Sequence, residues 1–384
     1  MNVADGSMTR RDFVKGAAGV TAVAALTGVG GTMAWNRATQ PEDPSDAWST
    51  ATGIDRILLA ATLAPSSHNT QPWRFRTNPE GIDLLGDTDR TMGRADPRLR
   101  ELHVSLGCAL ENAAIAAAAA GTPVVIEQVP DAPDGHFATL RFAAETEGDG
   151  ANAELATAIP RRRTNRGPFD ERVVAPASLA ALGALCNENV RVVWLTDPEA
   201  RARFTDLSVK ATEAHIADTE LQLDSHRWYR MSQSDAEEYR DGITVRGANL
   251  PVVISLFMEL FPPTPDSFDA GWAKATRTTH CGTAPVFGLL IGENAGDKSE
   301  WVNVGRTYER MQLAATMKGL SMHPISQALA IRDREVSTGS AGPFSAGLAE
   351  LGGAGEVALA FRLGYPTREQ QPSMRRQPTL VKAS

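Results

Sequence analysis

The sequence predicts an α+β protein built from two similar halves, residues 52–150 and 155–384. Two observations support this prediction. The chain has 384 residues, which exceeds a typical single domain. Two helical stretches, 107–121 and 305–319, share residue types at a constant offset of 198, and a strand-like segment follows each of them.

The first 40 residues are predicted to be a signal peptide rather than part of the fold. Residues 9–15, "TRRDFVK", match the twin-arginine export pattern, and a weakly apolar run from Gly16 to Trp35 follows. That run is nearly long enough to span a bilayer, and no clean cleavage site is visible, so a cleaved form and a membrane-anchored form both stay open. Residues 41–51 form a polar linker. The twin-arginine translocase is an expected partner, and the expected location is outside the cytoplasm.

The two matched helical stretches read "GCALENAAIAAAAAG" (107–121) and "GRTYERMQLAATMKG" (305–319). Glycine, glutamate, an aliphatic residue, two alanines and a final glycine agree position by position. The segments 138–144 and 357–364 then have the composition of strands. Because small residues let two backbones approach closely, we expect these helices at the interface between the halves. Similarity by composition alone is the alternative.

An insertion, residues 205–278, has no counterpart in the first half. It combines helical runs, aromatic residues and a proline-rich turn. Segments of this size added to a scaffold are often lids or binding surfaces, and a plain structural insertion is the alternative.

Charge and cysteine usage exclude some classes of function. The formal net charge of −8 argues against a nucleic-acid partner, which needs a basic face. Cys108, Cys186 and Cys281 show no C-x-x-C spacing and are interpreted as core residues. The histidines form no metal-binding motif, so no metal site is predicted.

Two polar segments are candidates for a binding site. The first, "APSSHNTQPWRFR" (64–76), is a proline-bounded turn between an amphipathic stretch and a strand-like one. The second, "RRRTNRGPF" (161–169), clusters arginines, whose planar multi-donor groups suit a phosphate. A solvated basic face is the alternative for the second segment.

The first segment resembles the signature of the nitroreductase superfamily of flavoproteins. Residues 161–169, "GLSMHPISQAL" (319–329) and "SMRRQP" (373–378) resemble that family's arginine segment, flavin-facing segment and basic phosphate contact. The tandem arrangement is most similar to the Acg-like branch, in which one chain carries two such halves. The resemblance implies a fused pseudo-dimer, each half a mixed or antiparallel sheet flanked by helices. It also implies FMN as the cofactor, with NAD(P)H as a candidate electron donor.

The resemblance further implies one complete site across the interface, because the turn occurs in the first half and the arginine segment in the second. Arg166 would lie near the N1/O2 edge of the ring, where a cation stabilises reduced flavin. Ser326 or Gln327 would offer a backbone N–H to the reactive N5. His68 and His323 are interpreted as structural. The expected cofactor contacts are Pro65, Ser66, Ser67, Asn69, Gln71, Arg162, Arg163, Thr164, Arg166, Pro324, Ile325, Ser326, Gln327, Arg375 and Arg376.

The sequence therefore predicts an exported FMN-dependent oxidoreductase of nitroreductase type, which passes electrons through flavin N5 to a small-molecule acceptor such as a nitroaromatic or a quinone. No acid–base residue is expected in hydride transfer to the flavin. The first alternative is a protein that stores or sequesters FMN, with residues 220–270 covering the ring. The second is a degenerate fold without a cofactor. The sequence leaves the electron donor, the acceptor and the oligomeric state open.

Overall fold

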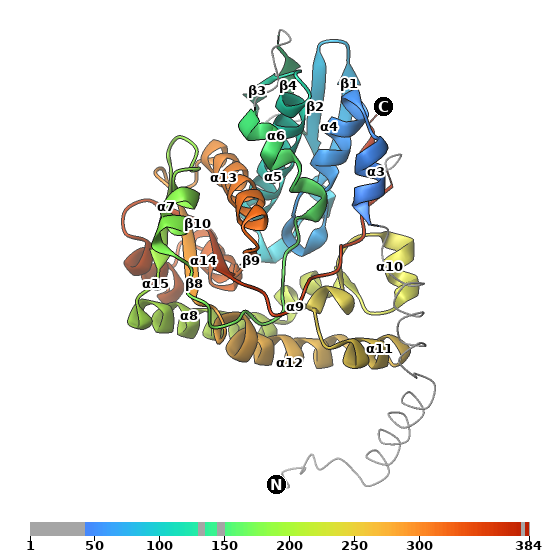
Figure 1. Cartoon of the computed structure of the whole chain (residues 1–384). Coiled ribbons are helices and arrows are strands. Elements are labelled where there is room, and N and C mark those ends of the chain that lie inside the picture. The colour runs from blue at the N-terminus through green and yellow to red at the C-terminus, as the bar shows by residue number, and fades with distance from the viewer. Residues whose placement is uncertain (1–42, 130–134, 144–149, 378–380, 384) are drawn as a thin grey trace, which may run out of the picture.

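The computed structural model describes residues 43–129, 135–143, 150–377 and 381–383 (Figure 1). The predicted signal peptide, residues 1–40, lies outside the described residues, and so does the last residue of the segment 373–378.

The first sheet is antiparallel, with the strand order β1-β2-β4-β3. Its strands are β1 (Trp73–Asn78), β2 (Gly81–Gly86), β3 (Val124–Gln128) and β4 (His136–Phe142). Along β1, buried Trp73 and Phe75 alternate with exposed arginines, because successive strand residues face opposite sides of a sheet. The buried face packs against α4 (Gly53–Thr62) and α5 (Arg100–Ala119).

The second sheet is also antiparallel, with the order β5-β8-β10-β9. Its strands are β5 (Val190–Leu195), β8 (Val286–Gly292), β9 (Ser321–Pro324) and β10 (Glu356–Gly364). Every residue of β8 and β10 is buried, so helices cover both faces of these central strands. When the four strands of each sheet are numbered in chain order, both sheets have the order 1-2-4-3. The predicted α+β class with two fused, similar halves is confirmed.

The helices α5 and α13 (Lys298–Met317) pack against each other between the two sheets (Figure 1). A Cβ atom added to Gly107 would lie 2.2 Å from the carbonyl oxygen of Val302, and one added to Gly305 would lie 2.1 Å from that of Val104. The contact is reciprocal, because the repeat offset of 198 relates Gly107 to Gly305 and Val104 to Val302. The expected position of these helices at the interface is confirmed. By length and composition α5 could cross a membrane, but it is mostly buried inside the protein.

Shorter helices complete the two halves, and most of the insertion lies below the sheets in the view of Figure 1. The covering helices are α3 (Pro44–Thr50), α6 (Gly150–Ala156), α7 (Pro176–Gly183), α14 (Gln327–Ser337) and α15 (Pro343–Gly352). Between β5 and β8 the chain forms α8 (Pro198–Ala217), α9 (Thr219–His226), β6 (Tyr229–Arg230), α10 (Gln233–Tyr239), β7 (Ile243–Thr244), α11 (Val252–Leu260), α12 (Pro265–Ala275) and the π-helix η6 (Thr276–Cys281). We propose that residues 205–278 within this region are a unit added to the second half.

The C-terminal segment returns from the second half to the first. The side-chain amide of Asn69 donates to the carbonyl oxygen of Met374 at 3.2 Å. The amide of Ala383 donates to the carbonyl oxygen of Phe75 at 2.7 Å, beside β1 (Figure 1). This return brings the basic residues of 373–377 to the polar turn.

Candidate functional site

The polar turn is a 3₁₀ turn, η1 (Ser67–Asn69), held in a strained backbone conformation. His68, Asn69 and Gln71 have φ angles of 46°, 55° and 51°, in the left-handed region that non-glycine residues avoid. Hydrogen bonds hold this conformation. The amide of Gln71 donates to Ser66 Oγ at 3.0 Å, and the amide of Ser67 donates to Ser105 Oγ at 3.1 Å. The short polar side chains therefore fold the turn onto the start of α5.

A cavity of about 490 Å³ lies where the two halves and the insertion meet. The first half contributes the turn, including Ser66 and Ser67, and the second half contributes the segment that contains Thr164 and Arg166. Other walls come from α13, from the residues after β9 and from the insertion. The lining residues of these walls include Tyr308, Pro324, Ser326, Gln327, Tyr229, Met258, Phe268 and Trp272.

The cavity walls carry polar atoms that are buried and have no hydrogen-bond partner in the described part of the chain. They are the hydroxyl of Tyr308, the side-chain oxygen of Gln327 and Nδ1 of His280. An unsatisfied buried polar atom costs about 1–3 kcal/mol, so such atoms are rarely left unpaired. These three atoms indicate a ligand with polar groups on its edge.

A smaller pocket of about 40 Å³ shares Pro65, Ser66, Thr164 and Arg166 with the larger cavity. Its other lining residues include Asn69, Arg162, Arg163, Pro372, Ser373 and Arg375.

Two guanidinium groups meet in this small pocket. Arg162 and Arg375 both donate to the carbonyl oxygen of Leu63, at 3.0 and 3.1 Å. The Nε atoms of both side chains are buried without a hydrogen-bond partner in the described residues, although Arg162 Nε lies 3.4 Å from Glu309 Oε1 as an ion pair. Burial first, and then Arg162 and Arg163, lower the pKa of Arg375 to about 9. Clustered cations with unused donors are the environment that a bound phosphate stabilises.

Four histidines line the large cavity, His68, His215, His280 and His323. Burial, followed by His215 and Arg166, lowers the pKa of His68 to about 3. Burial, followed by Arg362, lowers the pKa values of His280 and His323 well below the usual range. The imidazoles are therefore neutral at physiological pH. His68 and His323, interpreted from the sequence as structural, both lie in the cavity wall.

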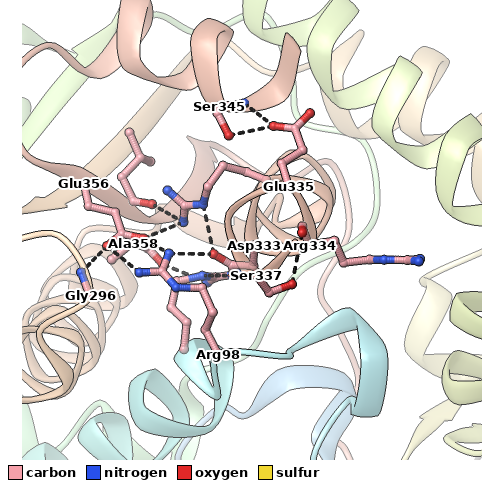
Figure 2. A network of polar contacts seen from close by, with 12 residues as sticks. Arg98, Gly296, Asp333, Arg334, Glu335, Ser337, Ser345, Glu356 and Ala358 are labelled. Carbon is pink, nitrogen blue, oxygen red and sulfur yellow. Dashed lines mark hydrogen bonds and ion pairs between the residues drawn. The ribbon is translucent and has the colours of Figure 1, made fainter. Parts of the chain in front are cut away.

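A buried ion network joins the two halves beside the cavity. In Figure 2, Arg98 reaches Asp333 of α14 and Glu356 of β10. Arg100 lines the cavity and donates to Asp333 at 2.7 Å and to the carbonyl oxygen of Ala358 at 2.8 Å. Burial alone would raise the pKa of Asp333, but Arg100 and Arg332 hold it below its usual range. The network fixes the start of α5 against the second half, and so fixes the two sides of the cavity.

The structure brings twelve of the fifteen expected contacts together. Three others line neither cavity, namely Gln71, Ile325 and Arg376. The side chain of Gln71 joins the carbonyl oxygen of Arg240 to the amide of Arg376, and the side chain of Arg376 donates to the carbonyl oxygen of Gln71 at 3.1 Å. Ile325 belongs to the apolar cluster of the second half. The structure therefore gives no support for direct ligand contacts by these three side chains.

Sequence reasoning missed several cavity residues. Tyr308 occupies the position that matches Leu110 in the first helical stretch, so a break in the repeat could have indicated it. His280 lies in a π-helix, an element that often marks functional sites and has no clear sequence signature. Phe268 and Trp272 of α12 could not be told from core residues by pattern alone.

Comparisons with known proteins show what the chain is similar to. Residues 7–27 match the family described as "TAT (twin-arginine translocation) pathway signal sequence". The chain is 28% identical over 280 residues to "Putative NAD(P)H nitroreductase Rv3131" of Mycobacterium tuberculosis H37Rv, covering 72% of this chain and 77% of the relative. It is 36% identical over 130 residues to "Putative NAD(P)H nitroreductase acg" of the same strain, covering 33% of this chain and 38% of the relative.

Among solved structures, the chain is similar to the FMN and NADPH-dependent nitroreductase NfnB from Sphigopyxis sp. strain HMH. The identity is 17%, the coverage is 60% of this chain and 98% of that chain, and the TM-score is 0.39. For NfnB of Mycobacterium smegmatis in complex with NADPH the identity is 17%, the coverages are again 60% and 98%, and the TM-score is 0.36.

The fold has two similar halves with a cavity between them, which is the arrangement that the resemblance to nitroreductases implied. The similarity to the two mycobacterial proteins named as putative NAD(P)H nitroreductases agrees with the resemblance seen in the sequence motifs. The twin-arginine signal predicted at the N-terminus is confirmed as well.

Proposed function

We propose that this chain is an exported FMN-dependent oxidoreductase of nitroreductase type that reduces nitroaromatic or quinone-like acceptors, with NAD(P)H as the electron donor. The observation that carries the proposal is the pair of neighbouring cavities, which share lining residues; the small one is lined by four arginines, and the other is large and mainly apolar. This pairing suits a ligand with a phosphate at one end and a flat ring at the other.

The residues present fit FMN. Arg162, Arg163 and Arg375 would hold its phosphate, and Ser66, Ser67, Arg166 and Gln327 would face its ring. Bound FMN would supply a redox centre that accepts a hydride at N5 and passes electrons on. Arg166 would favour the reduced, anionic ring, and the start of α14 at Ser326 and Gln327 would lie near N5. We propose one such site per chain, since the turn and the arginine segment each occur once.

The phosphate assignment is tested by Arg375→Gln, with the adjacent Arg376→Gln as the matched control. Loss of a charge-assisted hydrogen bond should weaken FMN binding about tenfold to a hundredfold in the Arg375 variant. The control should retain its flavin, because Arg376 lines neither cavity. Flavin content and FMN titration of the apoprotein measure the effect, and a thermal melt checks folding. Equal FMN affinity in both variants would contradict the assignment.

A storage protein is the second candidate. The observation that favours it is the insertion, because Tyr229, Phe268 and Trp272 line the same cavity and would restrict access to the ring. Anaerobic NADPH separates the two candidates. Bleaching of the visible flavin spectrum followed by reoxidation with an added quinone supports the enzyme. Flavin that dithionite reduces but NADPH does not, together with no oxidation by quinone, supports storage.

A further inference from the structure

Two histidines of the large cavity's wall, His280 of the π-helix and His323 of β9, lie against each other. Their ring centroids are 4.8 Å apart, and the rings are nearly perpendicular, at 83°. Both histidines are buried, and each is 7% exposed. We call this pair the imidazole recess.

Arg362 of β10 binds the imidazole recess through His323. It donates from Nε to His323 Nδ1 at 3.1 Å. Its other donors reach the carbonyl oxygens of Thr279, His280, Asn165 and Gly167, at 3.1, 3.3, 3.0 and 2.8 Å. Because a guanidinium group can only donate, Nδ1 of His323 must accept, and the proton of the neutral ring lies on Nε2. Arg362 thus fixes the tautomer of His323 and joins three segments of the wall.

His280 has a hydrogen-bonding atom that the described protein does not use. Its Nδ1 is buried and has no partner among the described residues, although the side chain lines the cavity. The π-helical turn holds the ring in this position at the end of α12. A ligand atom in the recess would remove the cost of leaving this nitrogen unpaired.

The charges around the recess select the kind of ligand atom. Arg362 and Arg166 are the charged groups that act on both rings, and both are cationic. His323 offers an N–H from Nε2, and His280 offers one in the tautomer that carries its proton on Nδ1. Such N–H donors beside cations favour an oxygen that is uncharged when it binds and gains negative charge on reduction. Across the same cavity, Phe268, Trp272 and Met258 supply an apolar wall suited to a flat ring.

We propose that His280 and His323 bind the carbonyl oxygen of a quinone-type acceptor in the cavity. The inference rests on the proposed function, which already includes quinone-like acceptors, and deepens it by naming the side chains that recognise the acceptor. His280 and His323 act as hydrogen-bonding residues for the acceptor, and Arg362 is a positioning residue that acts through His323.

Binding of menadione to the protein as purified, measured by isothermal titration calorimetry without an electron donor, tests the inference. His280→Phe keeps a ring of similar shape but removes the hydrogen bond, and its dissociation constant for menadione should rise about tenfold. His280→Gln keeps a polar group and should recover part of the affinity. His136→Phe on β4, outside the cavity lining, is the matched control and should bind menadione as the unmodified protein does.

Flavin content is recorded for every variant. Unchanged menadione affinity in His280→Phe, in a folded variant with unaltered flavin content, would overturn the inference. An equal loss of menadione affinity in His136→Phe and His280→Phe would also overturn the inference. Failure of the proposed function gives a different result, in which no FMN binds or NADPH does not reduce it, because calorimetry reads menadione binding without turnover.

Discussion

At the scale of single residues, the site depends on charges that the fold places away from water. Glu309 of α13 is buried and faces Arg162, with 3.4 Å between Glu309 Oε1 and Arg162 Nε. Burial, opposed by Arg162, raises the pKa of Glu309 from 4.5 to about 7. Glu111, its match in α5, instead accepts a hydrogen bond from Arg306 at 2.9 Å and pairs with Arg310. The same residue type therefore has different chemistry in the two halves.

The raised pKa of Glu309 gives a stability prediction. The folded state keeps this proton up to about pH 7, whereas the unfolded chain loses it near pH 4.5. The contribution to stability is therefore complete below pH 4.5 and is lost as pH rises through 7. Glu309→Gln stays neutral, so its free energy of unfolding relative to the unmodified protein should rise by about 1.4 kcal/mol per pH unit across this window.

Urea denaturation at pH 5 and at pH 7 measures the change. Asp55→Asn, at a residue exposed on the surface of α4, serves as the control. A difference between variant and unmodified protein that does not change with pH would show that Glu309 is ionised in the folded state throughout this range.

At the scale of elements, the contact between α5 and α13 holds the halves together. The two helices approach closely because Gly107 and Gly305 each lie against a carbonyl oxygen of the opposite helix. The site lies beside this contact, since Ser105, Cys108 and Tyr308 of the same helices line the large cavity. A change in helix spacing would therefore alter the cavity as well as the stability.

Gly107→Ala tests this close contact. The added Cβ would lie 2.2 Å from the oxygen of Val302, so the helices must separate. The free energy of unfolding should fall by about 1–3 kcal/mol, as for other overpacked cores. Gly271→Ala on α12 is the control, because a Cβ there meets nothing within 4 Å, and its stability should rise slightly. Equal melting temperatures for the two variants would contradict the close contact.

At the scale of the whole molecule, the insertion contributes side chains to the large cavity, and several of its residues bind one carboxylate. Asp269 of α12 accepts hydrogen bonds from Tyr229 at 2.7 Å, His226 at 2.8 Å and Gln222 at 3.0 Å. Burial, followed by Asp269, raises the pKa of Tyr229, so the hydroxyl stays a donor. Because Tyr229 and Phe268 line the cavity, this cluster links the order of the insertion to the shape of the site.

Asp269→Ala should loosen the insertion. Loss of the shared acceptor removes these three hydrogen bonds and leaves Gln222 only the 3.4 Å contact with Asp266. Hydrogen exchange of residues 219–275 should therefore become faster, while exchange in the two sheets should not change. Asp206→Ala on α8 is the control, since its ion pair with Lys210 lies on the surface. Exchange in 219–275 that matches the control would mean that Asp269 does not hold this segment.

The turn "APSSHNTQPWRFR" and the arginine segment were recognisable from the sequence, because hydrogen-bonding side chains and guanidinium groups are visible as residue types at fixed spacing. The repeat was recognisable because glycine and alanine recur where two helices must approach closely. Other parts of the site were not. Gln71 and Arg376 belong to suitable residue types, but the fold uses their groups to join the turn to the C-terminal segment. Trp272 belongs to the insertion and His280 lies just after it in the π-helix, and only tertiary packing places the two side chains in the cavity wall.

The sequence alone determined the two-halved α+β class, the export signal and the two polar segments, because these depend on periodicity, composition and local spacing. The tertiary structure decided which side chains meet. It placed Arg375 rather than Arg376 in the small pocket, and it packed two histidines of the cavity wall against each other, with Arg362 hydrogen-bonded to one of them. The physical reason is that burial, unpaired donors and the charge around a group arise from contacts between residues far apart in the chain, and no local pattern encodes them.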